Sequence, residues 1–177
     1  MHQHNPEIIF EIANSHNGNY ELLKKTIQEY SKIKIKKKSI KFQIFKYDTL
    51  ACNTFSWYNV YKKLFFSPDK WKKILNSCIK KKIKVYLDIY DSYGIKFLSK
   101  YEFKIEGIKI QYSSLINFEI INYLKYKNKN NNLEIIINIT SLNYDEIKKI
   151  YTELETKYKN ITLQFGHQDY PTLLSNS

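Results

Sequence analysis

Six short apolar segments, each followed by a stretch with helical spacing, constrain most strongly what this chain can fold into. Runs of about five residues rich in Ile and Val are typical of buried strands, whereas apolar residues three and four apart indicate amphipathic helices. Regular alternation of the two predicts a parallel sheet joined by crossover helices. Because no break in composition divides the chain, we expect residues 1–177 to form a single domain. The predicted strands cover residues 8–12, 40–45, 85–90, 107–111, 135–139 and 161–165.

The stretches between these strands carry the start signals of helices. Asn19 is suited to cap a helix over residues 19–33, and Ser67 followed by Pro68 is suited to start another. Residues 46–66 are rich in aromatic side chains and longer than an ordinary connection, which is typical of a lid or an irregular cover. Further helices are expected over residues 93–101, 117–126 and 144–158.

The two faces of the predicted sheet differ in polarity. Side chains of a strand alternate between its faces, and one face is apolar in every predicted strand. An open sheet between two helical layers needs two apolar faces, whereas a barrel needs only its outer face to be apolar. The pattern therefore favours an α/β fold of the (β/α) TIM-barrel type over an open doubly wound sheet. The polar face carries Glu11, Lys41, Gln43, Asp88, Lys109, Gln111, Asn138, Thr140 and Gln164.

The number of predicted strands is smaller than a closed barrel of this type requires. About six of eight βα units are present. Six units would leave two strand edges unpaired, which favours contact with a partner or aggregation. We therefore expect either that a C-terminal portion of the barrel is missing from this chain or that the barrel closes by another route, such as an oligomer.

The composition argues against several other classes of protein. The net charge of +12 would suit a polyanion, but every basic residue is lysine and base recognition depends strongly on arginine, so nucleic-acid binding is not expected. Cys52 and Cys78 have neither metal-type spacing nor a disulfide framework, which indicates a reducing compartment. No apolar run is long enough for a signal core or a membrane span. We expect a cytoplasmic protein with no membrane contact.

The charged residues of the polar face indicate an anion site. Lys41 and Lys109 lie on this face, and two converging ammonium groups suit a dianion with phosphate or carboxylate groups. Glu11 and Asp88 could hold sugar hydroxyls or pair with the lysines, and in the second case the four groups would form a buried salt-bridge network. A lysine inside a barrel could instead be the Schiff-base nucleophile of an aldolase. Ser113 and Ser114 follow the fourth strand, where hydroxyl and amide groups commonly receive phosphate oxygens.

Several motifs, in order along nearly the whole chain, resemble the N-terminal barrel of the sialic acid synthase family. They are residues 11–18 (EIANSHNG), 41–43 (KFQ) with Phe45 and Lys46, 107–110 (GIKI) with Ser113 and Asn117, and 166–172 (GHQDYPT). The resemblance implies a TIM-type barrel and a condensation in which phosphoenolpyruvate adds to the aldehyde carbon of an N-acetylated amino sugar. The products would be a nonulosonic acid and phosphate. The resemblance also implies a divalent metal, manganese or magnesium, which polarises the aldehyde as a Lewis acid.

The resemblance also implies roles for individual residues. Glu11 would contact the acceptor sugar, while Lys41, Lys109 and Ser113 would hold phosphoenolpyruvate. Glu11, Lys41 and Lys109 are the expected catalytic residues. The expected substrate-binding residues are Gln43, Asp88, Ser113, Asn117 and Tyr170, of which Asp88 is included for the hydroxyl contacts argued above.

The chain also departs from the family pattern. Ser114 stands where the family usually has an acid, and Asn138-Ile139-Thr140 replaces a usual Ser-Thr-Gly. The family's metal-binding histidines lie beyond the sixth strand, so the metal ligands are not expected within this chain, and His16 is expected to order the first turn instead. We therefore hypothesise an incomplete or degenerate synthase domain. The alternative is a catalytically inactive relic or an interaction protein that keeps the barrel core.

Overall fold

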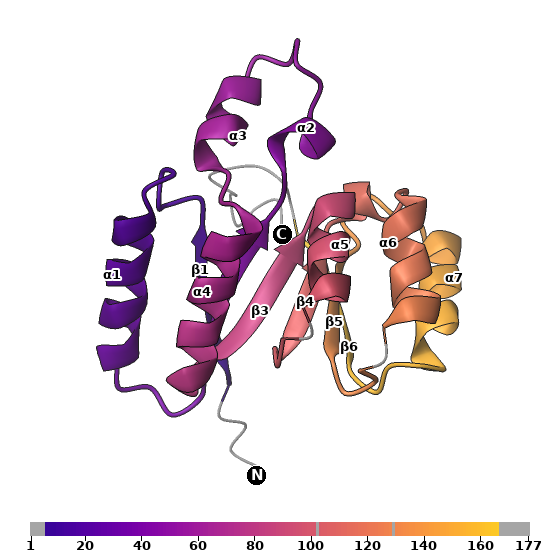
Figure 1. Cartoon of the computed structure of the whole chain (residues 1–177). Helices are drawn as coiled ribbons and strands as arrows, with labels where there is room; N and C mark the ends of the chain where they lie inside the picture. Colours follow the sequence, from indigo (N-terminus) through magenta and orange to yellow (C-terminus); the bar gives the residue numbers. More distant parts are fainter. Residues whose placement is uncertain (1–5, 102, 129, 167–177) are drawn as a thin grey trace, which may run out of the picture.

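The computed structural model describes residues 6–101, 103–128 and 130–166 (Figure 1). Within them, six parallel strands form one sheet, and their order in the sheet is their order in the chain. Each of the first five strands is followed by helical structure, as the alternating pattern predicts. The strands are β1 (Ile8–Ala13), β2 (Lys38–Ile44), β3 (Lys84–Ile89), β4 (Gly107–Ile110), β5 (Glu134–Asn138) and β6 (Ile161–Gln164).

The helices begin close to the predicted residues. Asn19 accepts a hydrogen bond from the Leu22 amide and caps α1, and Asn143 forms a capping box with Glu146 at the start of α7. The predicted helix over residues 117–126 is α-helical only in its first half, because its second half winds as a π-helix. The helices are α1 (Tyr20–Lys32), α2 (Tyr47–Leu50), α3 (Tyr58–Leu64), α4 (Pro68–Lys80), α5 (Ser92–Lys100), η1 (Tyr112–Ser114), α6 (Phe118–Asn122), η2 (Tyr123–Lys127) and α7 (Tyr144–Glu155).

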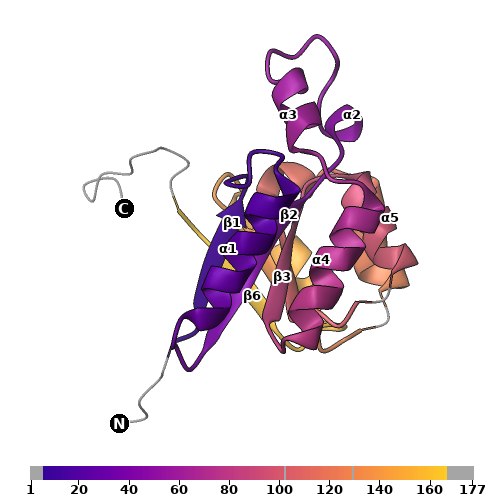
Figure 2. The same cartoon turned by 60° about the vertical axis from the view of Figure 1, so that its left-hand side comes forward.

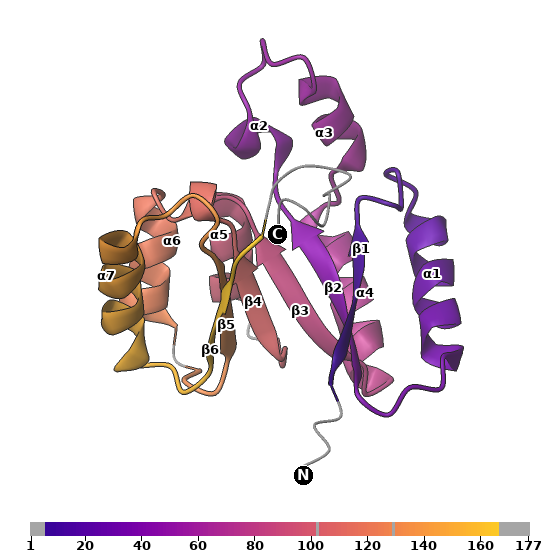
Figure 3. The same cartoon turned by 180° about the vertical axis from the view of Figure 1, so that it is seen from behind.

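The core lies between one face of the sheet and a layer formed by α1, α4, α5, α6 and α7. Phe42, Leu87 and Ile110 have no exposed surface, and they belong to the same buried cluster as Leu23 of α1 and Leu75 of α4. Complete burial of such a side chain contributes about 1.5–3 kcal/mol. Viewed from behind, the other face of the sheet has no helical layer over it among the described residues (Figure 3). The face predicted to be apolar is thus the one that packs against the helices, and the other face also carries the buried Tyr86 and Ile136.

The sheet curves but does not close within the described residues. In the part of the chain that the structure describes, β1 and β6 at the two ends of the sheet each pair with one strand. Side chains there are correspondingly more exposed, with Ile8 at 45% and Leu163 at 38%, although both belong to the predicted apolar face. Consecutive parallel strands with helices on one side are the arrangement of a (β/α) barrel, which confirms the predicted fold class.

The aromatic segment over residues 46–66 contains α2 and α3 and stands beyond the carboxyl end of β2 (Figures 1 and 2). Asp91, at the end of β3, holds its start: Oδ2 accepts hydrogen bonds from the Lys46 amide at 2.8 Å and from the Thr49 hydroxyl at 2.6 Å. Oδ1 of Asp91 accepts from the Gly94 amide and caps α5. One buried carboxylate thus joins the aromatic segment to the sheet.

Candidate functional site

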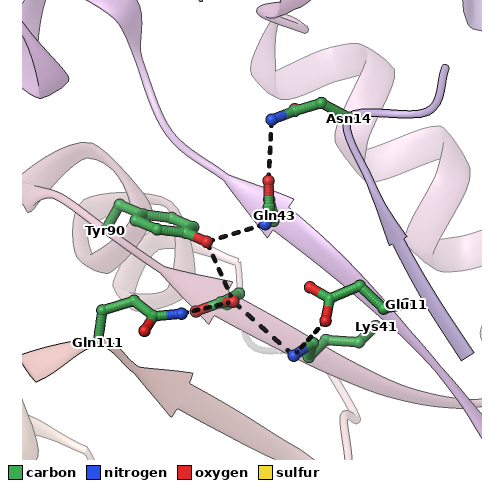
Figure 4. A network of polar contacts seen from close by, with 7 residues as sticks. Glu11, Asn14, Lys41, Gln43, Tyr90 and Gln111 are labelled. Atoms are coloured by element: carbon green, nitrogen blue, oxygen red, sulfur yellow. Dashed lines mark hydrogen bonds and ion pairs between the residues drawn. The ribbon is translucent and has the colours of Figure 1, made fainter. Parts of the chain in front are cut away.

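Charged residues of the first four strands meet on the face of the sheet that the helices do not cover, which we call the inner face. The register places Glu11 opposite Lys41, and it places Asp88 opposite both Gln43 and Lys109. Lys41 Nζ lies 3.0 Å from Glu11 Oε2 and 3.9 Å from Asp88 Oδ2 (Figure 4). Lys41 and Lys109 are buried and Asp88 has no exposed surface, whereas the side chain of Glu11 is 43% exposed. The cluster therefore opens to solvent on the side of Glu11.

Neutral polar groups complete this cluster. The Tyr90 hydroxyl accepts a hydrogen bond from Gln43 Nε2 at 2.8 Å and donates one to Asp88 Oδ2 at 3.2 Å. Gln111 Nε2 also donates to Asp88 Oδ2, at 3.3 Å, and Asn14 Nδ2 donates to Gln43 Oε1 at 2.9 Å (Figure 4). Oδ2 of Asp88 is thus surrounded by donors, while the buried Oδ1 has no hydrogen-bond partner in the described part of the chain.

Burial and neighbouring charges shift the pKa of the central groups. Burial raises the pKa of Asp88, and the charges of Lys41 and Lys109 oppose that rise. Burial also lowers the pKa of Lys109, and the positive charge of Lys41 adds to the effect. Burial and the Asp88 carboxylate raise the pKa of Tyr90, so its hydroxyl keeps its proton. Shifts of this kind in a cluster of buried polar groups are typical of functional sites.

The structure brings five of the eight expected residues into this cluster: Glu11, Lys41, Gln43, Asp88 and Lys109. Ser113 lies on η1 and is exposed, whereas its neighbour Ser114 is buried and donates from Oγ to the carbonyl of Tyr90 at 3.0 Å. Asn117 accepts from the Glu119 amide and caps α6. Tyr170 lies outside the described residues.

Tyr90 and Asn14 belong to the cluster but were not expected as site residues. Tyr90 follows Asp88 by two positions, so the period of the strand could have placed it on the same face. Asn14 carries no such signal, because the register between β1 and β2 shifts between Glu11 and Ala13. The positive φ of Ala13 continues this irregularity, which a period-two pattern does not predict.

The described residues do not fit a metal site. They contain no group of three or more His, Cys, Asp or Glu side chains that could hold a metal ion. His16 is buried, its Nδ1 accepts a hydrogen bond from the Gly18 amide at 3.0 Å, and its ring packs on Phe66. This confirms the prediction that His16 orders the first turn.

Solved structures share this fold. The N-acetylneuraminic acid (sialic acid) synthetase of Leptospira borgpetersenii, solved in complex with citrate, superposes with a TM-score of 0.78 at 21% identity over 97% of this chain and 58% of its own. A protein assigned as spore coat polysaccharide biosynthesis protein E, from Chromobacterium violaceum, gives a TM-score of 0.77 at 19% identity over 96% of this chain and 52% of its own. The chain thus spans between half and three fifths of these two proteins.

A family model then identifies the class of protein more closely. The model of the NeuB family matches residues 20–177, and the chain belongs to this family. The expected resemblance to sialic acid synthases is thereby confirmed at the level of the family. A search of curated proteins finds no match. Among the described helices, none is long and apolar enough to cross a membrane.

Proposed function

We propose that this chain provides the phosphoenolpyruvate-binding part of a sialic acid synthase-type enzyme of carbohydrate biosynthesis. The observation that carries the proposal is the position of two buried lysines, Lys41 and Lys109, on the strands that flank β3. Both lie on the inner face of the sheet, Lys41 in the middle of β2 and Lys109 one residue before the end of β4. Barrel enzymes bind their substrates at the carboxyl ends of their parallel strands. Membership in the NeuB family and the sialic acid synthetase among the solved neighbours support the same assignment.

The reaction joins phosphoenolpyruvate to the aldehyde carbon of an N-acetylated amino sugar. A carbon–carbon bond forms, one water is consumed, and the phosphoryl group leaves as inorganic phosphate. Lys41 and Lys109 would neutralise the carboxylate and phosphate of phosphoenolpyruvate. Glu11 is the most exposed acid of the cluster, and its carboxylate would accept hydrogen bonds from sugar hydroxyls.

The remaining expected residues have supporting roles in this proposal. Gln43 is fixed by hydrogen bonds to Asn14 and Tyr90, so it would orient a substrate amide or hydroxyl without rearrangement. Ser113 is exposed at the end of β4 and would donate to a phosphate oxygen. Asn117 and Tyr170 remain predicted substrate-binding residues. Since the described residues do not fit the divalent metal that the family uses, no step of the proposal passes through a metal.

Binding of phosphoenolpyruvate to the purified chain tests the proposal. A ligand at 100 times its Kd adds about 2.7 kcal/mol to the free energy of unfolding, which is measured as a rise in Tm. We expect this rise for the wild type and for Lys96→Met, because Lys96 is 69% exposed and pairs with Glu119 on the helical side. We expect its loss in Lys41→Met and in Lys109→Met. Equal shifts in all four proteins, or no shift in the wild type, would contradict the proposal.

Catalysis is tested separately, by phosphate release from phosphoenolpyruvate in the presence of a panel of N-acetylated hexosamines. Binding together with release that depends on Lys41 supports the synthase. Binding without release would favour the alternative, a protein that keeps the barrel core without turnover.

A further inference from the structure

Asp88 occupies the centre of the candidate anion site. It lies on β3, between the strand of Lys41 and the strand of Lys109, and the register sets it directly beside Lys109. Its carboxylate is completely buried. A carboxylate is an unfavourable neighbour for a bound anion, because two like charges in a buried site repel each other strongly. Its position therefore requires an explanation beyond that of a hydroxyl-binding residue.

The charges of the cluster are balanced when no ligand is bound. Lys41 is 3.0 Å from Glu11 and 3.9 Å from Asp88, and Asp88 is in register with Lys109, so the cluster contains two carboxylates and two lysines. A dianion that enters between Lys41 and Lys109 adds two negative charges to a neutral group. The uptake of one proton would relieve part of that excess, and the geometry shows which carboxylate can take it.

The two oxygens of Asp88 have different surroundings. Oδ2 accepts from the Tyr90 hydroxyl and from Gln111 Nε2, and it faces Lys41. Oδ1 is buried without a hydrogen-bond partner among the described residues, so a proton can reside there without displacing a donor. The Glu11 side chain is 43% exposed, and solvent stabilises its ionised form. Burial also raises the pKa of Asp88, which favours protonation of Asp88 over protonation of Glu11.

We propose that Asp88 is the specificity-determining residue of this site and that it takes up one proton when a dianion binds between Lys41 and Lys109. The inference deepens the proposed function and rests on the two lysines forming an anion site. With Asp88 ionised the site favours neutral or singly charged ligands, and with Asp88 protonated it accepts a dianion. Binding of a dianion therefore strengthens as the pH falls.

The charged and titratable groups that face Asp88 come from four strands. They are Glu11 on β1, Lys41 on β2, Tyr90 at the end of β3 and Lys109 on β4. Of these, Lys109 could also weaken anion binding at high pH by losing its proton, because its pKa is lowered. The variants must therefore distinguish the effect of Asp88 on the pH dependence of anion binding from the effects of Lys109 and Glu11.

The experiment titrates inorganic sulfate, which remains a dianion throughout, into the protein between pH 5 and pH 8.5 by calorimetry. We expect the affinity of the wild type to fall with rising pH, by at most about tenfold per pH unit, the limit for one proton. Asp88→Asn has nearly the same shape and still accepts from Tyr90 and Gln111. We expect it to bind sulfate more tightly than the wild type at high pH and to retain only the pH dependence that deprotonation of Lys109 causes.

Asp48→Asn is the matched control, because Asp48 pairs with Lys46 and is 39% exposed; it should behave as the wild type does. Glu11→Gln should keep the pH dependence. The wild type should also take up close to one proton per sulfate, measured in buffers of different ionisation enthalpy, and this readout needs no variant.

The possible failures are distinguishable. If sulfate binds but Asp88→Asn keeps the wild-type pH dependence, or no proton is taken up, the role of Asp88 is wrong while the anion site stands. If sulfate binds to no variant at any pH, both this inference and the proposed function are wrong.

Discussion

The Tyr86 hydroxyl donates a hydrogen bond to Oε2 of Glu134 at 2.7 Å, across the strand that lies between them. The residue of β4 in register with both is Gly107. A Cβ at Gly107 would lie 2.7 Å from Cε1 of Tyr86 and 2.6 Å from the carbonyl oxygen of Glu134. The Thr162 hydroxyl donates to Oε1 of the same glutamate at 2.9 Å. This contact joins β3, β5 and β6 on the inner face, and Tyr86 and Gly107 lie two residues before Asp88 and Lys109 on their strands.

The first prediction concerns the space at Gly107. Gly107→Ala should lower the free energy of unfolding by about 1–3 kcal/mol, because the methyl group must displace the Tyr86 ring or the strand backbone. The midpoint of urea unfolding measures the loss. Gly166→Ala is the control, since a Cβ there meets no atom of the described residues within 4 Å. If both variants unfold at the same midpoint, the close packing at Gly107 is refuted.

The second prediction concerns the Tyr90 hydroxyl. Tyr90→Phe removes the acceptor of Gln43 Nε2 and a donor to the buried Asp88, which should cost about 1–3 kcal/mol of stability. Because this hydrogen bond lowers the pKa of Asp88, the variant should also shift the pH dependence of sulfate binding to higher pH. Tyr144→Phe, at a residue that is 74% exposed, should change neither property. An unchanged pH profile in Tyr90→Phe would contradict the proposed coupling.

The third prediction concerns the attachment of the aromatic segment. Asp91→Ala leaves the Lys46 and Gly94 amides without their acceptor. The free energy that protects both amides from hydrogen exchange should then fall by about 1–3 kcal/mol, the cost of an unsatisfied buried group, so both amides should exchange faster. The same substitution at the exposed Asp69 should leave both exchange rates unchanged. Unaltered exchange at Lys46 in Asp91→Ala would show that α2 is held by other contacts.

The fourth prediction concerns the stability at acid pH. Burial lowers the pKa of His16 from 6.5, so the folded state holds the ring neutral while the unfolded state takes up a proton below about pH 6.5. The stabilisation by His16 is therefore present above that pH and decreases as the pH falls. The difference in free energy of unfolding between the wild type and His16→Asn should be smaller at pH 5.5 than at pH 8. A larger difference at pH 5.5 would mean that the ring is charged in the folded protein.

Part of the site could be predicted from the alternation of side chains along strands. Lys41, Asp88 and Lys109 each lie between apolar neighbours, and this pattern placed all three correctly on the inner face. The same rule could have included Tyr90. It could not distinguish Ser113 from Ser114, because both follow the end of β4, and the 3₁₀ turn exposes the first and buries the second.

By itself, the sequence determined the strand–helix order, the apolar face and the capped helix starts, because these depend on neighbouring residues and on the fixed periods of helix and strand. Only the tertiary structure decided which polar groups meet. The shift between Glu11 and Ala13 brings Asn14 to Gln43, and the parallel register brings Lys41 within reach of Asp88. Distances of this kind depend on how strands from distant parts of the chain pair, and no local pattern contains that information.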